Sequence, residues 1–277
     1  MTDYISIPKQ LVSRLTMIAT LSVLKAGEML KKGFGSPMNF TNKKGRHNLV
    51  TEWDQKSEEI IIELIKSHFP DHSILAEESG QSSDNNDSIL WIVDPLDGTV
   101  NFAHNIPLFS VSVAATYKQT ILAGAVYNPM LNELFTAEKD NGSFLNGSKL
   151  ATSQTAVLDS AILATGLPYN VHENPLQCIN HLSAFAKTGI PLRRMGSAAI
   201  DLCYVACGRF DGFWEVSLSP WDYAAAKLII EEAGGCITDF NGNPITSFTE
   251  KPILASNIHL AKQIQKKITA TINNEAN

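Results

Sequence analysis

The order of apolar and polar positions divides the chain into three parts. Apolar residues recur at helical spacing over residues 10–32 and stop at Gly33, which predicts a first helix, and residues 51–69 predict a second. Short apolar segments then follow one another closely, and the tight spacing of the last three is typical of antiparallel hairpins. The strands predicted in this middle part cover residues 73–76, 89–93, 109–117, 121–128 and 133–136.

After about Leu150, strands alternate with helices. The pattern predicts strands at residues 161–165 and 210–216 and helices at residues 175–187, 197–207 and 221–233. We therefore expect a layered α/β (α+β) fold built from two halves. Residues 1–150 would form an N-terminal α+β half with an antiparallel sheet, and residues 151–277 a C-terminal α/β half with a mixed sheet.

Composition narrows the classes of protein that fit this pattern. With 277 residues, of which 44% are hydrophobic, the chain can bury a large core. Its net charge of −6 argues against a basic face for nucleic acid or an anionic membrane surface. Asp3 stands where a signal peptide has a base, and the apolar run over residues 15–24 is too short to span a bilayer. We expect a cytoplasmic protein that acts on a small molecule.

The most informative segment for chemistry covers residues 91–99. An apolar strand breaks at Asp94-Pro95, and a second carboxylate, Asp97, precedes a Gly-Thr pair at which a helix can start. Mg²⁺ prefers oxygen ligands, so clustered carboxylates suit it and His or Cys clusters do not. Gly98 lets the backbone approach a ligand closely, and the amides of Gly98 and Thr99 suit a phosphate group. The segment predicts a site for divalent cations and phosphate.

Two further segments add carboxylates. Glu77 follows a short apolar strand, and Asp222 opens a predicted helix behind Pro220. Hydrolysis of a phosphate monoester requires charge to be neutralised on the attacking water, the phosphoryl oxygens and the leaving group together, and two or more Mg²⁺ ions do this. The carboxylates of the three segments therefore indicate a Mg²⁺-dependent phosphatase.

Several candidate residues also have a purely structural interpretation. Asp94-Pro95 suits a turn that ends a strand, and Asp222 suits the first turn of a helix. The spacing from Thr51 to Asp54 resembles a capping box with Asp in place of Glu or Gln. Lys43 and Glu215 fit ordinary solvated positions. The ordered combination favours the functional interpretation, because independent capping does not explain it.

Five motifs occur in order along the chain: LVTEWD at residues 49–54, AEES at 76–79, DPLDGTVNFAH at 94–104, GSAA at 196–199 and WD at 221–222. This series resembles the inositol monophosphatase family of lithium-sensitive, metal-dependent phosphatases over nearly the whole chain. The resemblance implies a five-layer αβαβα fold, a site at the junction of the two halves, and a homodimer.

The resemblance also implies roles for the carboxylates, with two or three Mg²⁺ ions as cofactors. Glu77, Asp94 and the Leu96 carbonyl would bind the first ion. Asp94, Asp97 and Asp222 would bind a second, weaker one, so that Asp94 bridges the two. Glu77 would also reach a third, water-rich metal position.

The remaining roles concern water and substrate. Asp54 and Thr99 would orient and deprotonate the attacking water, with Glu77 as the third catalytic residue. Lys43 stands at the register of the family's mobile active-site lysine. The substrate contacts implied by the resemblance are Lys43, Asp97, Gly98, Thr99, Gly196, Ser197, Ala198, Glu215 and Asp222.

The choice of substrate stays open within the superfamily. Residues 97–104 resemble inositol monophosphatases more than nucleotide 3′-phosphatases, which favours myo-inositol 1-phosphate as substrate. Histidinol phosphate or another sugar or nucleotide phosphate is the alternative. A protein-binding role in bacterial transcription or ribosomal RNA processing is a second alternative, because some bacterial relatives of the family have one; it would act through protein contacts.

Overall fold

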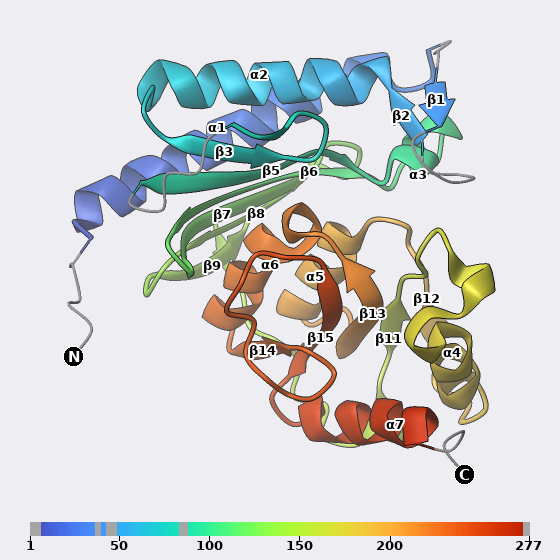
Figure 1. The fold of residues 1–277 in the computed structure, drawn as a ribbon. Coiled ribbons are helices and arrows are strands. Elements are labelled where there is room, and N and C mark those ends of the chain that lie inside the picture. The colour runs from blue at the N-terminus through green and yellow to red at the C-terminus, as the bar shows by residue number, and fades with distance from the viewer. Residues whose placement is uncertain (1–6, 37–39, 43–48, 83–87, 274–277) are drawn as a thin grey trace.

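In the computed structural model, which describes residues 7–36, 40–42, 49–82 and 88–273, helices and sheets alternate in five layers (Figure 1). One outer layer holds α1 (Lys9–Gly33) and α2 (Glu52–His68). Helices α5 (Ala198–Ala206) and α6 (Pro220–Glu232) lie between the two large sheets. The opposite outer layer holds α4 (Cys178–Ala186) and α7 (Ala261–Asn273), so the expected layering is confirmed.

The first helix forms because its apolar residues fall on one stripe. Leu15, Ile18, Val23 and Leu30 are fully buried against the first sheet and α2, while the exposed side is mostly polar apart from Met17 and Leu21. Gly27 lies where α1 crosses the Tyr127 ring, and a Cβ atom there would stand 2.5 Å from that ring. The absence of a side chain thus lets the helix approach the sheet closely.

The first large sheet has eight strands in the order β10-β9-β8-β7-β6-β5-β3-β4. Every neighbouring pair is antiparallel except β3 and β5, which run parallel. The predicted antiparallel N-terminal sheet is therefore found with one parallel pair in it. The chain returns along the outer edge of β3 as β4 before it enters β5, and β5 consequently runs in the direction of β3. The strands are β3 (Ser73–Ala76), β4 (Gly80–Gln81), β5 (Ile89–Asp97), β6 (Ser110–Tyr117), β7 (Thr120–Asn128), β8 (Glu133–Glu138), β9 (Gly142–Leu145) and β10 (Ser148–Lys149).

A bulge at the end of β5 sets up the site. Asp94 pairs with Ser112 and Asp97 pairs with Ser110, so β5 carries one more residue than β6 over this stretch. Pro95, which has no N–H to donate, lies inside the bulge, and its carbonyl accepts a hydrogen bond from Ser57 Oγ of α2 at 2.7 Å. The bulge therefore breaks the regular alternation of side chains at the point where both carboxylates occur.

The second large sheet has five strands in the order β12-β11-β13-β15-β14. Strand β11 runs parallel to both of its neighbours, whereas β15 pairs antiparallel with β13 and β14, so the expected mixed sheet is confirmed. The strands are β11 (Leu163–Thr165), β12 (Leu192–Arg193), β13 (Gly212–Leu218), β14 (Gly235–Thr238) and β15 (Lys251–Asn257). The smaller elements are the β1–β2 hairpin (Phe40–Asn42, Leu49–Thr51), helix α3 (Thr99–Ala103) and 3₁₀ turns at Leu158–Ser160, Val171–Glu173 and Pro175–Gln177.

Helix α6 packs unusually close to the first sheet. A Cβ atom on Gly124 of β7 would stand 2.9 Å from the carbonyl oxygen of Ala225 and 3.1 Å from its Cα. The helix backbone thus rests directly on the strand backbone, and the position of Asp222 in the first turn of α6 is fixed relative to the first sheet.

No helix in the described parts of the chain is both long and apolar enough to cross a membrane.

Candidate active site

The site begins at the end of β5, where Asp94 is buried and Asp97 is half-buried. Asp94 Oδ1 accepts a hydrogen bond from the Leu96 N–H at 3.0 Å, which holds the carboxylate over its own turn. The Leu96 carbonyl accepts the Thr99 hydroxyl at 3.0 Å. Gly98 between them has φ 96°, a left-handed value that glycine adopts without strain, and this turn starts α3 at Thr99 as expected.

Asp97 links the end of β5 to the start of helix α5. One of its oxygens accepts hydrogen bonds from Ser197 Oγ at 2.5 Å and from the Ala199 N–H at 2.8 Å, and the other accepts the Ala198 N–H at 3.2 Å. These N–H groups belong to the first turn of α5, where helical N–H groups have no partner within the helix. Ser110 of β6 donates to the same carboxylate at 3.4 Å. Asp97 therefore caps α5 from the opposite sheet.

Asp222 and Glu77 reach the same region from two other segments. Asp222 accepts the Ser219 N–H at 2.7 Å, a capping contact at the start of α6. Glu77 directly follows β3, and its N–H donates to the Val93 carbonyl of β5 at 3.2 Å. The turn behind Glu77 is held by Glu58 of α2, which accepts the N–H groups of residues 78 and 79 at 2.9 and 3.0 Å.

The electrostatics show that these four carboxylates share one environment. Burial raises the pKa of Asp94 well above its ordinary value, and the charges of Glu77, Asp97 and Asp222 raise it further. Burial likewise raises the pKa of Asp222, with Asp97 and Glu77 adding to the effect. The pKa of Asp97 is raised by burial, while its hydrogen bonds from Ser197 and the α5 backbone oppose the shift. The region accordingly favours a positive partner.

The donor set fits Mg²⁺, although the ligand shell is open. Within the described residues, no three Asp, Glu, His or Cys side chains already stand close enough to hold a metal ion. In the structure, three of the carboxylates accept hydrogen bonds from main-chain N–H groups: Asp94, Asp97 and Asp222. A carboxylate has about four lone-pair sites, so such bonds leave oxygens that can bind a cation, and an all-oxygen set is what Mg²⁺ prefers.

Beside the carboxylates lies the pair of residues expected to handle water. Asp54 is fully buried, and its Oδ1 accepts the Thr99 hydroxyl at 2.9 Å. Its other oxygen accepts the Thr51 N–H at 2.7 Å and the Thr51 hydroxyl at 2.5 Å, which completes the capping box of α2. The capping and functional interpretations of Asp54 are thus compatible, because each uses a different oxygen.

Glu215 lies on β13, near enough to Asp97 to feel its charge, and is 8% exposed. Burial raises its pKa to about 8, with Asp97 raising it further and Arg194 lowering it. Gly196 has φ 85° and packs against Asn101, and Ser197 is buried. Glu215 therefore shares its electrostatic surroundings with the metal-site carboxylates.

Of the expected site residues, Lys43 lies outside the described residues. The others lie at the end of β5, in the loop after β3, at the starts of α2, α5 and α6, and on β13. Their substrate and metal roles stay predictions.

Four residues with clear positions here were missed by sequence reasoning: Glu58, Asn101, Ser110 and Asp201. Asn101 donates to the carbonyls of Leu108 and Met195 at 2.7 and 2.8 Å and so ties the α3 loop to the turn before α5. Asp201 is 2% exposed, and its Oδ1 has no hydrogen-bond partner within the described structure. The sequence offered one sign of Asp201, because it is the single carboxylate in the otherwise apolar run of residues 198–206.

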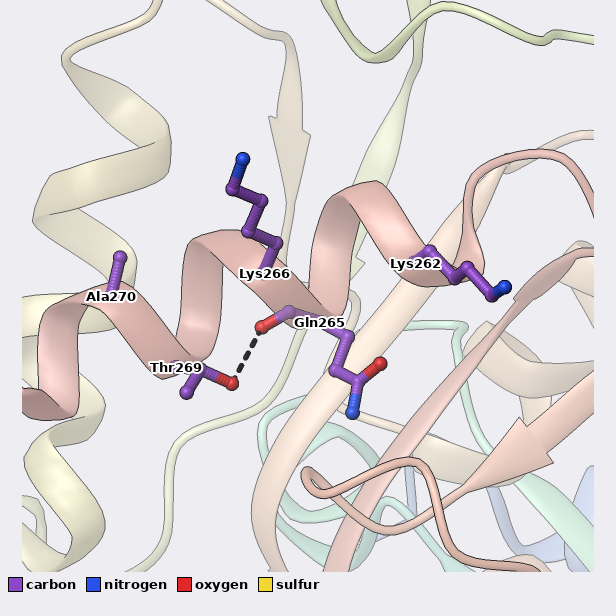
Figure 2. Close-up of a pocket in the computed structure, with 5 residues that line it drawn as sticks. All are labelled: Lys262, Gln265, Lys266, Thr269 and Ala270. Atoms are coloured by element: carbon purple, nitrogen blue, oxygen red, sulfur yellow. Dashed lines mark hydrogen bonds between the residues drawn. The ribbon is translucent and has the colours of Figure 1, made fainter.

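The hollow in Figure 2 is separate from this site. It lies on α7 and is lined by Lys262, Gln265, Lys266, Thr269 and Ala270. It contains none of the motif residues, and its charged side chains are lysines. The carboxylate junction is therefore the better candidate for the active site.

Fold and site together define a phosphoric monoester hydrolase of the layered α/β class. The chain belongs to the inositol monophosphatase family, whose model matches residues 11–276. Nus factor SuhB of Escherichia coli (strain K12) is 42% identical over 226 residues, 81% of this chain and 85% of that protein. Inositol-1-monophosphatase of Synechocystis sp. is 41% identical over 260 residues, 92% of this chain and 88% of that protein. The crystal structure of extragenic suppressor protein suhB from Bartonella henselae has a TM-score of 0.85 at 37% identity and covers 92% of this chain and 98% of that one.

Proposed function

We propose that this protein hydrolyses the phosphate monoester of a small polyol, with myo-inositol 1-phosphate as its main substrate and Mg²⁺ as cofactor. The observation that carries the proposal is the meeting of Glu77, Asp94, Asp97 and Asp222, from three chain segments, beside the Thr99–Asp54 pair. A buried cluster of this charge suits cations that in turn neutralise a phosphoryl group.

The protein's own residues have distinct tasks in this proposal. Glu77, Asp94, Asp97, Asp222 and the Leu96 carbonyl would hold the ions. Bound Mg²⁺ supplies charge neutralisation and acidifies the attacking water. Asp54 fixes the Thr99 hydroxyl at 2.9 Å, and this pair would orient the water and accept its proton.

In this proposal, the residues that select the alcohol part of the substrate lie in the second half of the chain. The Glu215 carboxyl can bond to ring hydroxyls, and the turn at Gly196 to Ala198 lies where α5 begins beside Asp97. A hydroxyl-rich leaving group therefore matches these residues better than an apolar one.

A substrate panel tests the proposal. Phosphate release from myo-inositol 1-phosphate, histidinol phosphate and p-nitrophenyl phosphate would be measured with Mg²⁺ and with EDTA. We expect the highest kcat/KM for the inositol ester and no turnover in EDTA. Preference for histidinol phosphate would favour the alternative substrate, and Mg²⁺-independent turnover would contradict the proposed site.

The same reasoning extends to ion inhibition and assembly. Li⁺ is close to Mg²⁺ in radius with half the charge, and Ca²⁺ accepts longer, more irregular coordination, so both should inhibit turnover. We also propose that the protein is cytoplasmic and forms a homodimer. Light scattering of the purified protein would check the homodimer.

An additional role in transcription is supported by a separate observation. A relative at 42% identity bears the name Nus factor SuhB. We propose that any such role runs through protein contacts and is independent of catalysis. Pull-down of transcription proteins should then be equal for the native chain and an inactive Asp97→Asn variant, and loss of binding in that variant would contradict the separation.

A further inference from the structure

The end of strand β11 lies directly against the Glu215 side chain. Strands β11 and β13 are parallel, with Thr165 paired to Trp214, and the Thr165 hydroxyl donates to the Trp214 carbonyl at 2.7 Å. The next residues along the two strands are Gly166 and Glu215. A Cβ atom built on Gly166 would stand 1.8 Å from Glu215 Oε2 and 2.2 Å from Cδ. The carboxyl therefore occupies the space that any side chain at position 166 would fill.

Backbone conformation does not account for this glycine. The glycines with left-handed φ values include Gly98 and Gly196, whereas Gly166 is not one of them. An alanine would be tolerated at position 166 by the backbone alone. The clash with Glu215 is thus the specific obstacle to a side chain there.

The clash cannot be relieved by a small adjustment. Non-bonded carbon and oxygen atoms do not approach to 1.8 Å, so the whole carboxyl would have to leave its place. Glu215 is 8% exposed and lies near the charges of Asp97 and Asp222, and Asp201 feels its charge in turn. Among the described residues, Arg194 is the one positive group whose charge acts on Glu215, while Asp97 repels it, so a displaced carboxyl would exchange a buried place for contacts with a mixed set of charges. The observed position of the Glu215 carboxyl therefore requires that residue 166 has no Cβ atom.

We propose that Gly166 is a specificity-determining residue: its missing side chain leaves the space that holds the Glu215 carboxyl toward the substrate's hydroxyl groups. Gly166 is a positioning residue that acts through Glu215. The inference rests on the proposed function, in which Glu215 contacts the polyol.

A double-mutant cycle with two substrates tests the inference. The measured quantity is the ratio of kcat/KM for myo-inositol 1-phosphate to that for p-nitrophenyl phosphate. Loss of one hydrogen bond between the Glu215 carboxyl and a substrate hydroxyl should lower this ratio about 5- to 150-fold in Glu215→Gln. Gly166→Ala should lower the ratio by a similar factor, and the double variant should fall no further than the more affected single variant.

Two additional variants separate positioning from general damage. Glu215→Asp in the Gly166→Ala background shortens the carboxyl side chain and should restore part of the ratio. Thr165→Val removes the hydroxyl bond between the strands without placing an atom against Glu215, and its ratio should equal that of the native protein.

Stability gives a readout that does not depend on activity. Gly166→Ala should lower the urea midpoint in the native background and should lower it less when Glu215 is replaced by Ala, because the second change vacates the space. Equal destabilisation in both backgrounds, or failure to fold in both, would overturn the inference by making Gly166 a requirement of the fold.

The kinetic outcomes also distinguish the two proposals. An unchanged ratio in Gly166→Ala, or losses that simply add in the double variant, would overturn the role of Gly166 alone. An unchanged ratio in Glu215→Gln would instead contradict the polyol contact in the proposed function.

Discussion

At the scale of single residues, several side chains serve the fold and the proposed chemistry at once. Asp54 caps α2 with one oxygen and holds Thr99 with the other. Asp222 caps α6, and Asp97 caps α5 from across the molecule. The structural interpretations of Asp54 and Asp222 were therefore correct, whereas the capping role of Asp97 was not predicted. These structural roles did not exclude function, because a carboxylate has more lone pairs than one cap uses.

Because Asp97 and Asp222 each serve both the fold and the proposed metal site, replacing them by Asn should affect turnover alike but stability differently. Asp97→Asn and Asp222→Asn should each reduce Mg²⁺-dependent turnover by several orders of magnitude, because each removes an anionic ligand. Without metal, Asp222→Asn should keep its stability, since an amide oxygen still caps α6. Asp97→Asn should be about 1 kcal/mol less stable, because its amide nitrogen cannot accept the second α5 N–H.

Phosphate release and urea unfolding in EDTA measure the two effects. Native-like turnover in Asp97→Asn would rule out the metal assignment. Equal stability of the two variants would show that the α5 cap contributes little.

Thr99 offers a test of the water-handling pair. Thr99→Val keeps the shape of the side chain but removes the hydroxyl that bonds to Asp54 and Leu96. We expect kcat to fall by about 10²- to 10⁴-fold, the usual contribution of general acid–base groups. Steady-state kinetics over a Mg²⁺ titration would measure it, with Thr99→Ser as the control that retains the hydroxyl. A shift in Mg²⁺ requirement without loss of kcat would assign Thr99 to metal binding instead.

At the scale of elements, the periodic segments were predicted well and the irregular ones were not. The first helix was expected at residues 10–32 and is found at Lys9–Gly33, and residues 73–76 match β3. Strand β5 was expected to end at residue 93 but continues to Asp97, because pairing with β6 resumes beyond the bulge, which apolar periodicity does not reveal. Strand β15 and helix α7 were not predicted: the strand starts at Lys251-Pro252, and the helix is mostly polar.

The loop after β3 depends on a contact with a distant element. Glu58 of α2 accepts two N–H groups of the turn that carries Glu77. Glu58→Gln loses one acceptor, so we expect the Mg²⁺ concentration for half-maximal activity to rise about 10- to 100-fold, as is usual when a group that orients a metal ligand is changed. A Mg²⁺ titration of initial rates measures the shift, and Glu59→Gln, on the exposed side of α2, is the matched control. An unshifted titration would mean that the Glu77 turn does not need Glu58.

The packing of α4 on α7 should depend on pH. His181 is fully buried, bonds to the Thr271 hydroxyl and meets the Phe240 ring edge to face at 5.6 Å. Burial lowers its pKa, so the unfolded chain binds the proton more readily than the folded one. The stability present above the ordinary value of 6.5 should therefore be lost as pH falls below it, by up to about 1.4 kcal/mol per pH unit.

Urea unfolding at pH 7.5 and 5.5 would measure this dependence. His181→Phe should reduce the difference between the two pH values, and Thr271 would keep its bond to the Ile268 carbonyl. An unchanged difference would assign the pH dependence to other groups.

At the scale of the whole molecule, the ordered motifs predicted the family and the layers, whereas the parallel pair in the first sheet became visible only in the structure. The parallel pairing of β3 and β5 and the closeness of β7 to α6 depend on contacts between segments far apart in sequence. The carboxylates of the first sheet and Asp222 of α6 come together only through this packing. Sequence order alone could not reveal which distant groups, such as Glu58 and Asp201, would face them.

Because the proposed ligands come from both halves, Mg²⁺ should stabilise the whole molecule. At 100 times its dissociation constant, a ligand that binds only the folded state adds about 2.7 kcal/mol. We expect the urea midpoint to rise with Mg²⁺ in the native protein and to rise less in Asp222→Asn, which keeps the proposed donors of the first ion but lacks one donor of the second. A midpoint that does not respond to Mg²⁺ in the native protein would argue against cation binding at the junction.

The spacing of the proposed ligands along the chain has a consequence for folding on the ribosome. Glu77, Asp94, Leu96 and Asp97 are all translated before the second sheet exists, whereas Asp222 is made roughly 125 residues later. At about 5 to 20 residues per second, this interval lasts on the order of 6 to 25 seconds. During that time the nascent chain holds the donors proposed for the first ion but not all of those proposed for the second, and until α5 (Ala198–Ala206) is made Asp97 has no helix to cap. Under the proposed ligand assignment, the nascent protein would therefore acquire one cation well before it becomes an enzyme.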